Sequence, residues 1–122
     1  MKNIVITFLF VFSIPCFSQD TITTAKVNEY IDKEVCVSGK VVSFKLASEG
    51  KFTNYINIDK PYPNSVFTVV ITNNHLEKLN IKIEDLQDAA IYVKGKITTY
   101  KNDPKQIPQI YNPISLEVKK TK

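Results

Sequence analysis

The feature that most constrains this fold is a ten-residue pattern that occurs twice. "VCVSGKVVSF" spans residues 35–44, and "IYVKGKITTY" spans residues 91–100. Both segments alternate apolar and polar residues around a Gly-Lys pair, which is typical of β-strands with one face in a core. The chain has only three glycines, so two in this pattern require an explanation. We interpret Gly39 and Gly95 as bend or bulge positions, where a side chain would obstruct the close approach of a neighbouring strand.

Alternation and turn residues predict strands at 34–46, 55–59, 66–71, 90–101 and 114–118, with a short "IPQIY" segment at 107–111 before the last strand. Residues 21–34 are predicted to form a short helix or turn that leads into the first strand. Residues 72–88 have apolar residues at helical spacing, an Asn N-cap and a break in register near Asn80. Five short strands with a helix between the third and fourth is the order of the OB-fold. We therefore predict an all-β domain with one inserted helix, folded as a five-stranded Greek-key OB barrel whose first and fourth strands are neighbours.

Several short motifs resemble a bacterial OB-fold family of exported proteins whose function is poorly characterised. They are "GKV" at 39–41, "YIN" at 55–57, "YPN" at 62–64 followed by Phe67, "GKI" at 95–97, and "PQI" at 108–110. The resemblance covers about two thirds of the chain, from residue 35 to residue 118. It implies an OB-type module that binds nucleic acid or another ligand, without an established reaction.

The first eighteen residues have the features of a secretory signal peptide. Lys2 precedes the eleven-residue apolar run "IVITFLFVFSI", and small residues flank position 17. We expect cleavage after Ser18, which divides the chain into a signal peptide (1–18), a lead-in (19–33), the OB-fold domain (34–118) and a basic tail (119–122). The expected protein is exported, periplasmic or secreted, with no membrane span. A mature start at a lipidated Cys16 instead of Gln19 is the alternative.

Export also makes the two cysteines informative, because paired cysteines are oxidised outside the cytoplasm. A chain cut after Ser18 would keep only Cys36, so we expect no internal disulfide. The "VCVSG" context indicates a strand residue that packs as a small hydrophobe rather than a reactive nucleophile.

The positive charge of the chain is concentrated at its end. Residues 19–118 contain twelve lysines and twelve acidic residues, and the chain has no arginine. Nucleic-acid binders usually carry a basic excess, because neutralised phosphates release counterions. The lack of arginine also removes the bidentate donor favoured for guanine edges, which counts against sequence-specific duplex recognition.

A candidate binding site follows from the way OB-folds bind oligonucleotides or oligosaccharides. They use the face of the second and third strands, beside the loops that join strands one to two and four to five. Tyr55, Asn57 and Phe44 are predicted on or beside this face, with Tyr62 in the nearby Pro-Tyr-Pro turn. The two loops would add Lys45, Lys51, Phe52, Tyr100, Lys101 and Lys105. Aromatic rings can stack on bases for about 1–3 kcal/mol each, while lysines neutralise phosphates.

Each of these residues also has a purely structural interpretation. Strands favour tyrosine for packing, which could account for Tyr55, Tyr92 and Tyr100, while Tyr62 could stiffen its turn. Asn57 and Asn64 fit hydrogen-bonding positions in turns or bulges. Lys40, Lys94 and Lys96 fit a solvated outer face.

Catalytic and metal-binding patterns are weak by comparison. The chain has one histidine, His75, with no second histidine or cysteine near it in sequence, whereas zinc sites need several N and S ligands. The acids of "EDLQD" fit the start of a helix, where the dipole favours negative charge. We predict no enzyme, no cofactor and no metal site. Two functions fit: non-specific binding of single-stranded nucleic acid, or non-catalytic binding of a small molecule, glycan or protein partner.

Overall fold

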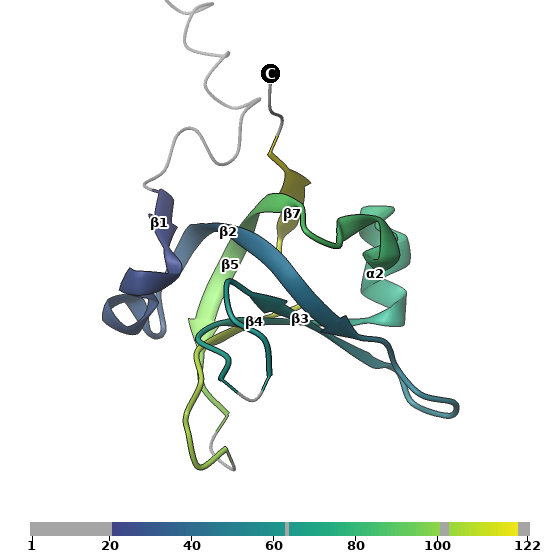
Figure 1. Cartoon of the computed structure of the whole chain (residues 1–122), viewed down its shortest axis with the longest axis horizontal. Coiled ribbons are helices and arrows are strands. Elements are labelled where there is room, and N and C mark those ends of the chain that lie inside the picture. The colour runs from purple at the N-terminus through teal and green to yellow at the C-terminus, as the bar shows by residue number, and fades with distance from the viewer. Residues whose placement is uncertain (1–20, 63, 101–102, 120–122) are drawn as a thin grey trace, which may run out of the picture.

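The computed structural model describes residues 21–62, 64–100 and 103–119. Within them the fold is mostly β, with seven strands and three short helical segments (Figure 1). The elements are β1 (Thr21–Thr23), the 3-10 helix η2 (Thr24–Tyr30), β2 (Glu34–Lys45), β3 (Thr53–Ile58), β4 (Thr68–Thr72), α2 (Asn73–Leu79), the 3-10 helix η3 (Ile83–Leu86), β5 (Ala90–Thr98), β6 (Gln109–Tyr111) and β7 (Ser115–Val118).

Five of the strands form a closed ring of backbone pairings. β2 pairs with β3, β3 with β4, β4 with β6, β6 with β5, and β5 with β2. The β4–β6 pairing is parallel and the other four are antiparallel. Such a ring leaves the backbone groups of its strands paired around an enclosed core.

The strand count differs from the predicted five in two places. β1 runs parallel to the first half of β2, with Thr21 opposite Cys36, where β3 does not reach. The predicted closing strand at 114–118 corresponds to β7, and the "IPQIY" segment before it forms an additional strand, β6; both pair with β5. Asn112 lies between them with a left-handed φ of 46° and is followed by Pro113, which has no N–H to donate. This turn redirects the chain and ends β6.

The predicted helical insertion is likewise two short segments. Asn80 ends α2 in the left-handed conformation, with φ of 60°, so the predicted break in register is confirmed. The predicted Asn N-cap is wrong, because Thr72 caps α2 with its hydroxyl, which accepts the His75 N–H at 3.4 Å. Glu84 and Asp85 lie in the first turn of η3, as expected for acids near a helix start.

The two Gly-Lys segments are neighbouring strands, as predicted. β2 and β5 are antiparallel, with Val35 opposite Gly95. A Cβ at Gly39 would collide with Cγ2 of Ile58, and one at Gly95 would lie 2.6 Å from Cγ2 of Ile110. Glycine is therefore required by side chains packed inside the ring. The bulge lies elsewhere, at the register shift between Val41 and Ser43.

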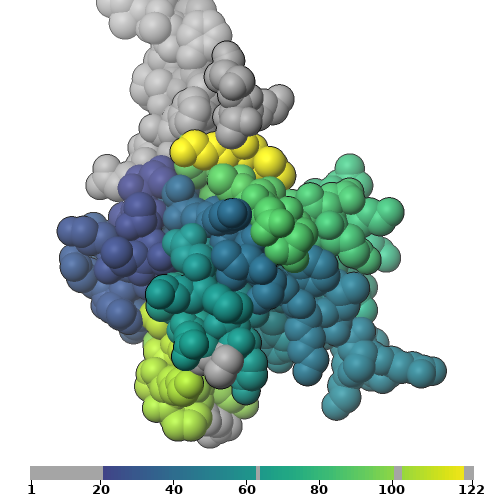
Figure 2. Space-filling view, in the orientation of Figure 1, coloured from purple at the N-terminus to yellow at the C-terminus, as the bar shows by residue number. Residues whose placement is uncertain are grey.

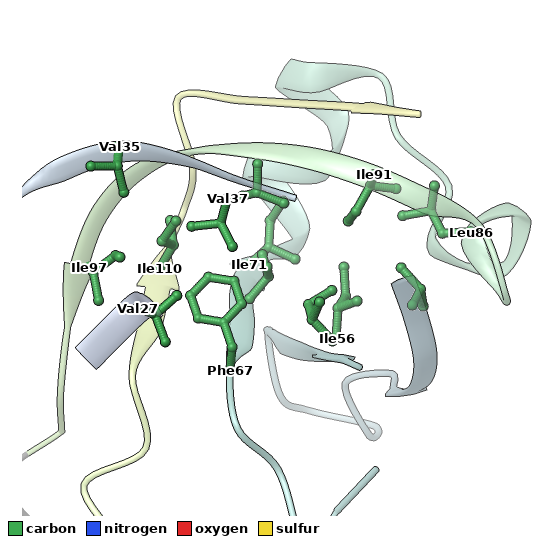
Figure 3. Packing of buried hydrophobic residues seen from close by; sticks show 14 of the residues in the cluster. Val27, Val35, Val37, Ile56, Phe67, Ile71, Leu86, Ile91, Ile97 and Ile110 are labelled. Atoms are coloured by element: carbon green, nitrogen blue, oxygen red, sulfur yellow. The ribbon is translucent and has the colours of Figure 1, made fainter. Parts of the chain in front are cut away.

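The core is a single cluster of aliphatic residues around Phe67, which is completely buried (Figure 3). Val27 of η2 and Leu86 of η3 belong to this cluster and lie toward opposite ends of it (Figure 3). Ile22 of β1 is also a member. Residues from the predicted lead-in therefore contribute to the same core as the barrel strands.

Cys36 lies on the outward phase of β2, between the core residues Val35 and Val37 and opposite Lys94. It is completely buried and disulfide-bonded. The expectation of no disulfide concerned a chain cut after Ser18, and the predicted signal peptide lies outside the described residues. Within the described part, no helix combines the length and apolar character needed to cross a membrane.

Candidate binding face

One face of the β3–β4–β6 sheet points away from the core and carries an aligned row of side chains. Residues directly opposite each other on paired strands point to the same face. Lys45 is opposite Tyr55, Tyr55 is opposite Val70, and Val70 is opposite Tyr111. We call these four residues the tyrosine row. Because adjacent strands are about 4.8 Å apart, the backbones of the two tyrosines are separated by roughly 10 Å.

The exposure of the row indicates two accessible rings beside an apolar floor. Tyr55 is 42% exposed and Tyr111 is 55% exposed. Val70 between them is only 5% exposed, although it does not belong to the core cluster. Val70 is therefore almost inaccessible, although it lies on the outward phase of β4. This arrangement offers flat aromatic surfaces to a ligand without loss of core packing.

A second row, next to the tyrosine row, is polar and internally hydrogen-bonded. Ser43, Asn57, Thr68 and Gln109 are opposite one another on successive strands. Asn57 donates from Nδ2 to Ser43 Oγ at 2.9 Å, and its Oδ1 accepts from Thr68 Oγ1 at 3.2 Å. The Asn57 side chain is buried. It therefore holds three strands together and is not placed to bind a ligand, which agrees with its structural interpretation.

The β2–β3 hairpin extends the face beyond the barrel and projects from the molecule (Figure 2). It forms an open hollow of about 570 Å³ whose lining includes four predicted site residues: Lys45, Lys51, Phe52 and Tyr55. Asn54 fixes the base of this hairpin. Its Oδ1 accepts the Ala47 N–H at 2.8 Å, and its Nδ2 donates to the Ile71 carbonyl at 3.0 Å. The structure thus brings two lysines and two aromatic rings together at one end of the tyrosine row.

The loop between β5 and β6 does not join this hollow. Asp103 organises the loop, because its carboxylate accepts the N–H groups of Lys105 at 2.9 Å and Ile107 at 3.0 Å. The Ile107 and Lys105 N–H groups lower the pKa of Asp103 below its usual value, although desolvation opposes the shift. Lys105 lines a separate hollow of about 520 Å³ with residues of η2 and the β3–β4 loop. Tyr100 is exposed, and Lys101 lies outside the described residues.

Two predicted site residues are placed differently from the expectation. Phe44 lies opposite the buried Ile56 and packs against the core, so its placement on the open face is wrong. The alternation was shifted because the bulge between Val41 and Ser43 changes which residues point inward. Tyr62 is strongly exposed in the β3–β4 loop, outside the row and both hollows.

Tyr111 is the residue that the sequence reasoning missed. It lies one position after Ile110, which is completely buried in the core. In a strand, the residue next to an inward isoleucine points outward. The segment "PQIY" therefore contained the signal, but only once its pairing with β4 was known.

The described residues contain no group of three or more His, Cys, Asp or Glu side chains that could hold a metal ion. His75 has its Nε2 2.6 Å from the Pro113 carbonyl oxygen. This hydrogen bond connects α2 with the turn before β7. His75 is therefore half-buried between two elements, and its backbone N–H takes part in the N-cap of α2.

Comparisons with known proteins identify the fold. No family model and no curated protein matches the chain. A putative aspartyl-tRNA synthetase from Leishmania major is similar in structure, with TM-score 0.57 and 11% identity over 83% of this chain and 21% of the synthetase. The chain therefore spans about a fifth of that protein.

Two smaller structures are similar over most of this chain. OBody AM1L10, solved bound to hen egg-white lysozyme, has TM-score 0.57 and 17% identity over 84% of this chain and 96% of its own. A chain of the yeast Stn1 and Ten1 structure has TM-score 0.56 and 16% identity over 84% of this chain and 64% of its own. At these identities the likeness concerns the fold alone. Together with the closed ring of β2, β3, β4, β6 and β5, it shows that this domain is a variant of the OB-fold with two additional strand segments.

Proposed function

We propose that this domain is a non-catalytic binding module that binds single-stranded nucleic acid, without sequence preference, on its β3–β4–β6 face. The tyrosine row is the observation that carries the proposal. Two exposed rings flank Val70, and the row ends at Lys45 beside the hairpin hollow. Bases of any sequence can stack on such rings, and lysines at the hollow can neutralise the adjacent phosphates.

The geometry fits a single strand better than a duplex. In a duplex the flat faces of the bases are stacked on one another, so the tyrosine rings could not reach them. An unpaired strand can turn individual bases onto Tyr55 and Tyr111 while its backbone passes Lys45 and Lys51. The lysine side chains act as point charges and do not distinguish bases, which supports binding without sequence preference. The aspartyl-tRNA synthetase among the similar structures acts on a nucleic acid, which supports this ligand class by analogy only.

Fluorescence anisotropy with a labelled single-stranded oligonucleotide tests the proposal. We expect binding at low salt, weakened by about 5- to 150-fold in Tyr55→Ala and in Tyr111→Ala, since each ring contributes about 1–3 kcal/mol of stacking. Tyr92→Ala is the matched control, because Tyr92 is a strand tyrosine on β5, paired with Glu117 and outside the row. Its affinity should stay near that of the unchanged protein.

Removal of residues 119–122 separates binding at the face from attraction to the basic tail. If the oligonucleotide binds only when the tail is present, the interaction is electrostatic and the face is not the site. Absence of binding at low salt would also refute the proposal.

A protein, glycan or small-molecule ligand is the second candidate. The equal number of lysines and acids in residues 19–118 favours it, because a neutral domain lacks the field that attracts nucleic acid. One similar structure is an OBody bound to lysozyme. For this candidate, Tyr55→Ala and Tyr111→Ala would weaken binding of the partner while oligonucleotides fail to bind.

Export completes the proposal. It is supported by Lys2, the apolar run at residues 4–14 and the small residues before Gln19. Mass spectrometry of the protein purified from cells would show an N-terminus at Gln19. Retention of Met1, or a lipid on Cys16, would contradict cleavage after Ser18.

A further inference from the structure

β7 forms an end of the sheet in the described part of the chain. Its partner on one side is β5, and no described strand pairs with its other side. Figure 1 shows β7 at the rim of the molecule, next to the C-terminal end of the chain. Two exposed apolar residues mark this edge, Ile114 at 55% and Val118 at 50% exposure. An open edge with apolar side chains is a template for pairing with another strand.

The hydrogen-bonding phase of β7 shows which backbone groups this edge offers. The Lys119 N–H donates to the Ala90 carbonyl at 2.7 Å. In an antiparallel pair, alternate residues turn their N–H and C=O groups toward the partner strand. Glu117 therefore points its backbone groups toward Tyr92 of β5, whereas Leu116 and Val118 point theirs toward the open edge.

We propose that a second copy of this chain pairs with β7 through the same edge, antiparallel, with Leu116 opposite Leu116 of the other copy. In this register the Ile114 side chain of each copy comes opposite Val118 of the other, so both exposed apolar side chains are covered. The Ile114 N–H takes no part in the pairing, because it donates to the Lys94 carbonyl of β5 at 2.8 Å. A shift that places Leu116 opposite Val118 would put two Glu117 carboxylates opposite each other, which is unfavourable. The self-complementary order of the edge thus selects a two-fold pairing.

An unsatisfied hydroxyl supports the same register. Ser115 Oγ is buried and has no hydrogen-bond partner within the described residues. The proposed register places Ser115 opposite Glu117 of the second copy. Directly opposite side chains that lie between the hydrogen-bonded pairs have Cα atoms about 4.5 Å apart. The Ser115 hydroxyl can then donate to the Glu117 carboxylate, once on each side of the two-fold axis.

Sedimentation velocity over a concentration series tests the pairing, with the full chain expressed and purified as the host cell processes it. We expect a reversible monomer–dimer equilibrium that Val118→Pro shifts to monomer. Proline at this position removes an N–H that points to the open edge, and edge strands tolerate such a proline. Ile114→Lys should also shift the equilibrium to monomer, because it places a charge beside the paired edge. Leu46→Lys is its control, since Leu46 is likewise an exposed apolar residue but lies away from this edge, and it should leave the equilibrium unchanged.

The register itself is tested by two substitutions at one position. Ser115→Lys places a positive charge opposite each Glu117, whereas Ser115→Glu places like charges there. We expect the dimer dissociation constants of these two variants to differ by about fourfold or more, with Ser115→Lys the tighter. A chain that stays monomeric at all soluble concentrations, a dimer that survives Val118→Pro, or equal effects of Ser115→Lys and Ser115→Glu would each overturn the proposal.

Discussion

Gly95→Ala should destabilise the domain although alanine is usually the more favourable residue in a folded chain. The added Cβ would lie 2.6 Å from Cγ2 of Ile110 and 3.5 Å from Cα of Pro113. Two carbon atoms that are not bonded do not approach each other to 2.6 Å, so the Ile110 side chain must move within a closed core. Overpacking of this kind costs about 1–3 kcal/mol, which exceeds the gain of about 0.4–1 kcal/mol from reduced freedom of the unfolded chain.

Urea denaturation of four proteins measures this effect: the unchanged chain, Gly95→Ala, Ile110→Ala and the double variant. Ile110→Ala alone should cost about 2–5 kcal/mol, because it opens a cavity. In the double variant the new methyl occupies space that Ile110 has left. The double variant should therefore be less destabilised than the sum of the two single effects predicts, by about 1 kcal/mol or more.

Gly50→Ala is the control for this cycle. Gly50 has φ of +81°, and a Cβ added there would meet no heavy atom within 4 Å, so its substitution introduces backbone strain without a collision. Strain of about 1–2 kcal/mol is expected there, with no coupling to Ile110. The reasoning is refuted if Gly95→Ala is neutral, or if its effect adds to that of Ile110→Ala.

Three further changes test the positions assigned to single residues. Asn54→Ala should lower the free energy of unfolding by about 1–3 kcal/mol, because it removes the hydrogen bonds of the Asn54 side chain with the Ala47 N–H, the Ile71 carbonyl and Asn73 Oδ1; thermal denaturation measures it. Phe44→Ala should lower stability but leave oligonucleotide affinity unchanged, since Phe44 packs against the core. The pKa of Asp103 is lowered from its usual 3.8 in the folded protein. The hydrogen bonds of its carboxylate therefore stabilise the loop fully above pH 3.8, and this stabilisation is lost as pH falls through the lower pKa of the folded state. An NMR titration in which Asp103 shows a pKa of 3.8 or more would contradict this.

The barrel was predictable because local alternation of apolar and polar residues marks its strands. The order of these strands and the inserted helix along the chain then indicates the OB-fold. The pattern around Gly39 and Gly95 indicated two long strands with a close contact, and the structure places a packed isoleucine at each glycine. The conformation of the turn between β6 and β7 was not predictable from alternation alone. It depends on the left-handed Asn112, whose conformation is also fixed by a distant contact: Asn112 Oδ1 accepts the Thr72 N–H at 2.9 Å.

The candidate site was predicted in part for a similar reason. Lys45, Lys51, Phe52 and Tyr55 are close in sequence, and the hairpin brings them together. Tyr111 joins Tyr55 only through the parallel β4–β6 pairing, which no local pattern reveals. Phe44 was misplaced because one bulge residue reverses the inward and outward phase.

The salt dependence of binding connects the tyrosine row with the neutral charge of the domain. For single strands, the logarithm of the affinity falls by about 0.7 per phosphate contact for each tenfold rise in salt. If Lys45 and Lys51 make the phosphate contacts, the slope is about −1.4, and affinity falls only about sevenfold between about 50 and 200 mM salt. The steep dependence expected of a basic nucleic-acid binder does not apply here, because stacking on Tyr55 and Tyr111 does not release ions. A slope near −1.4 that persists after removal of residues 119–122 supports this division of the binding energy, and a steeper slope that disappears with the tail refutes it.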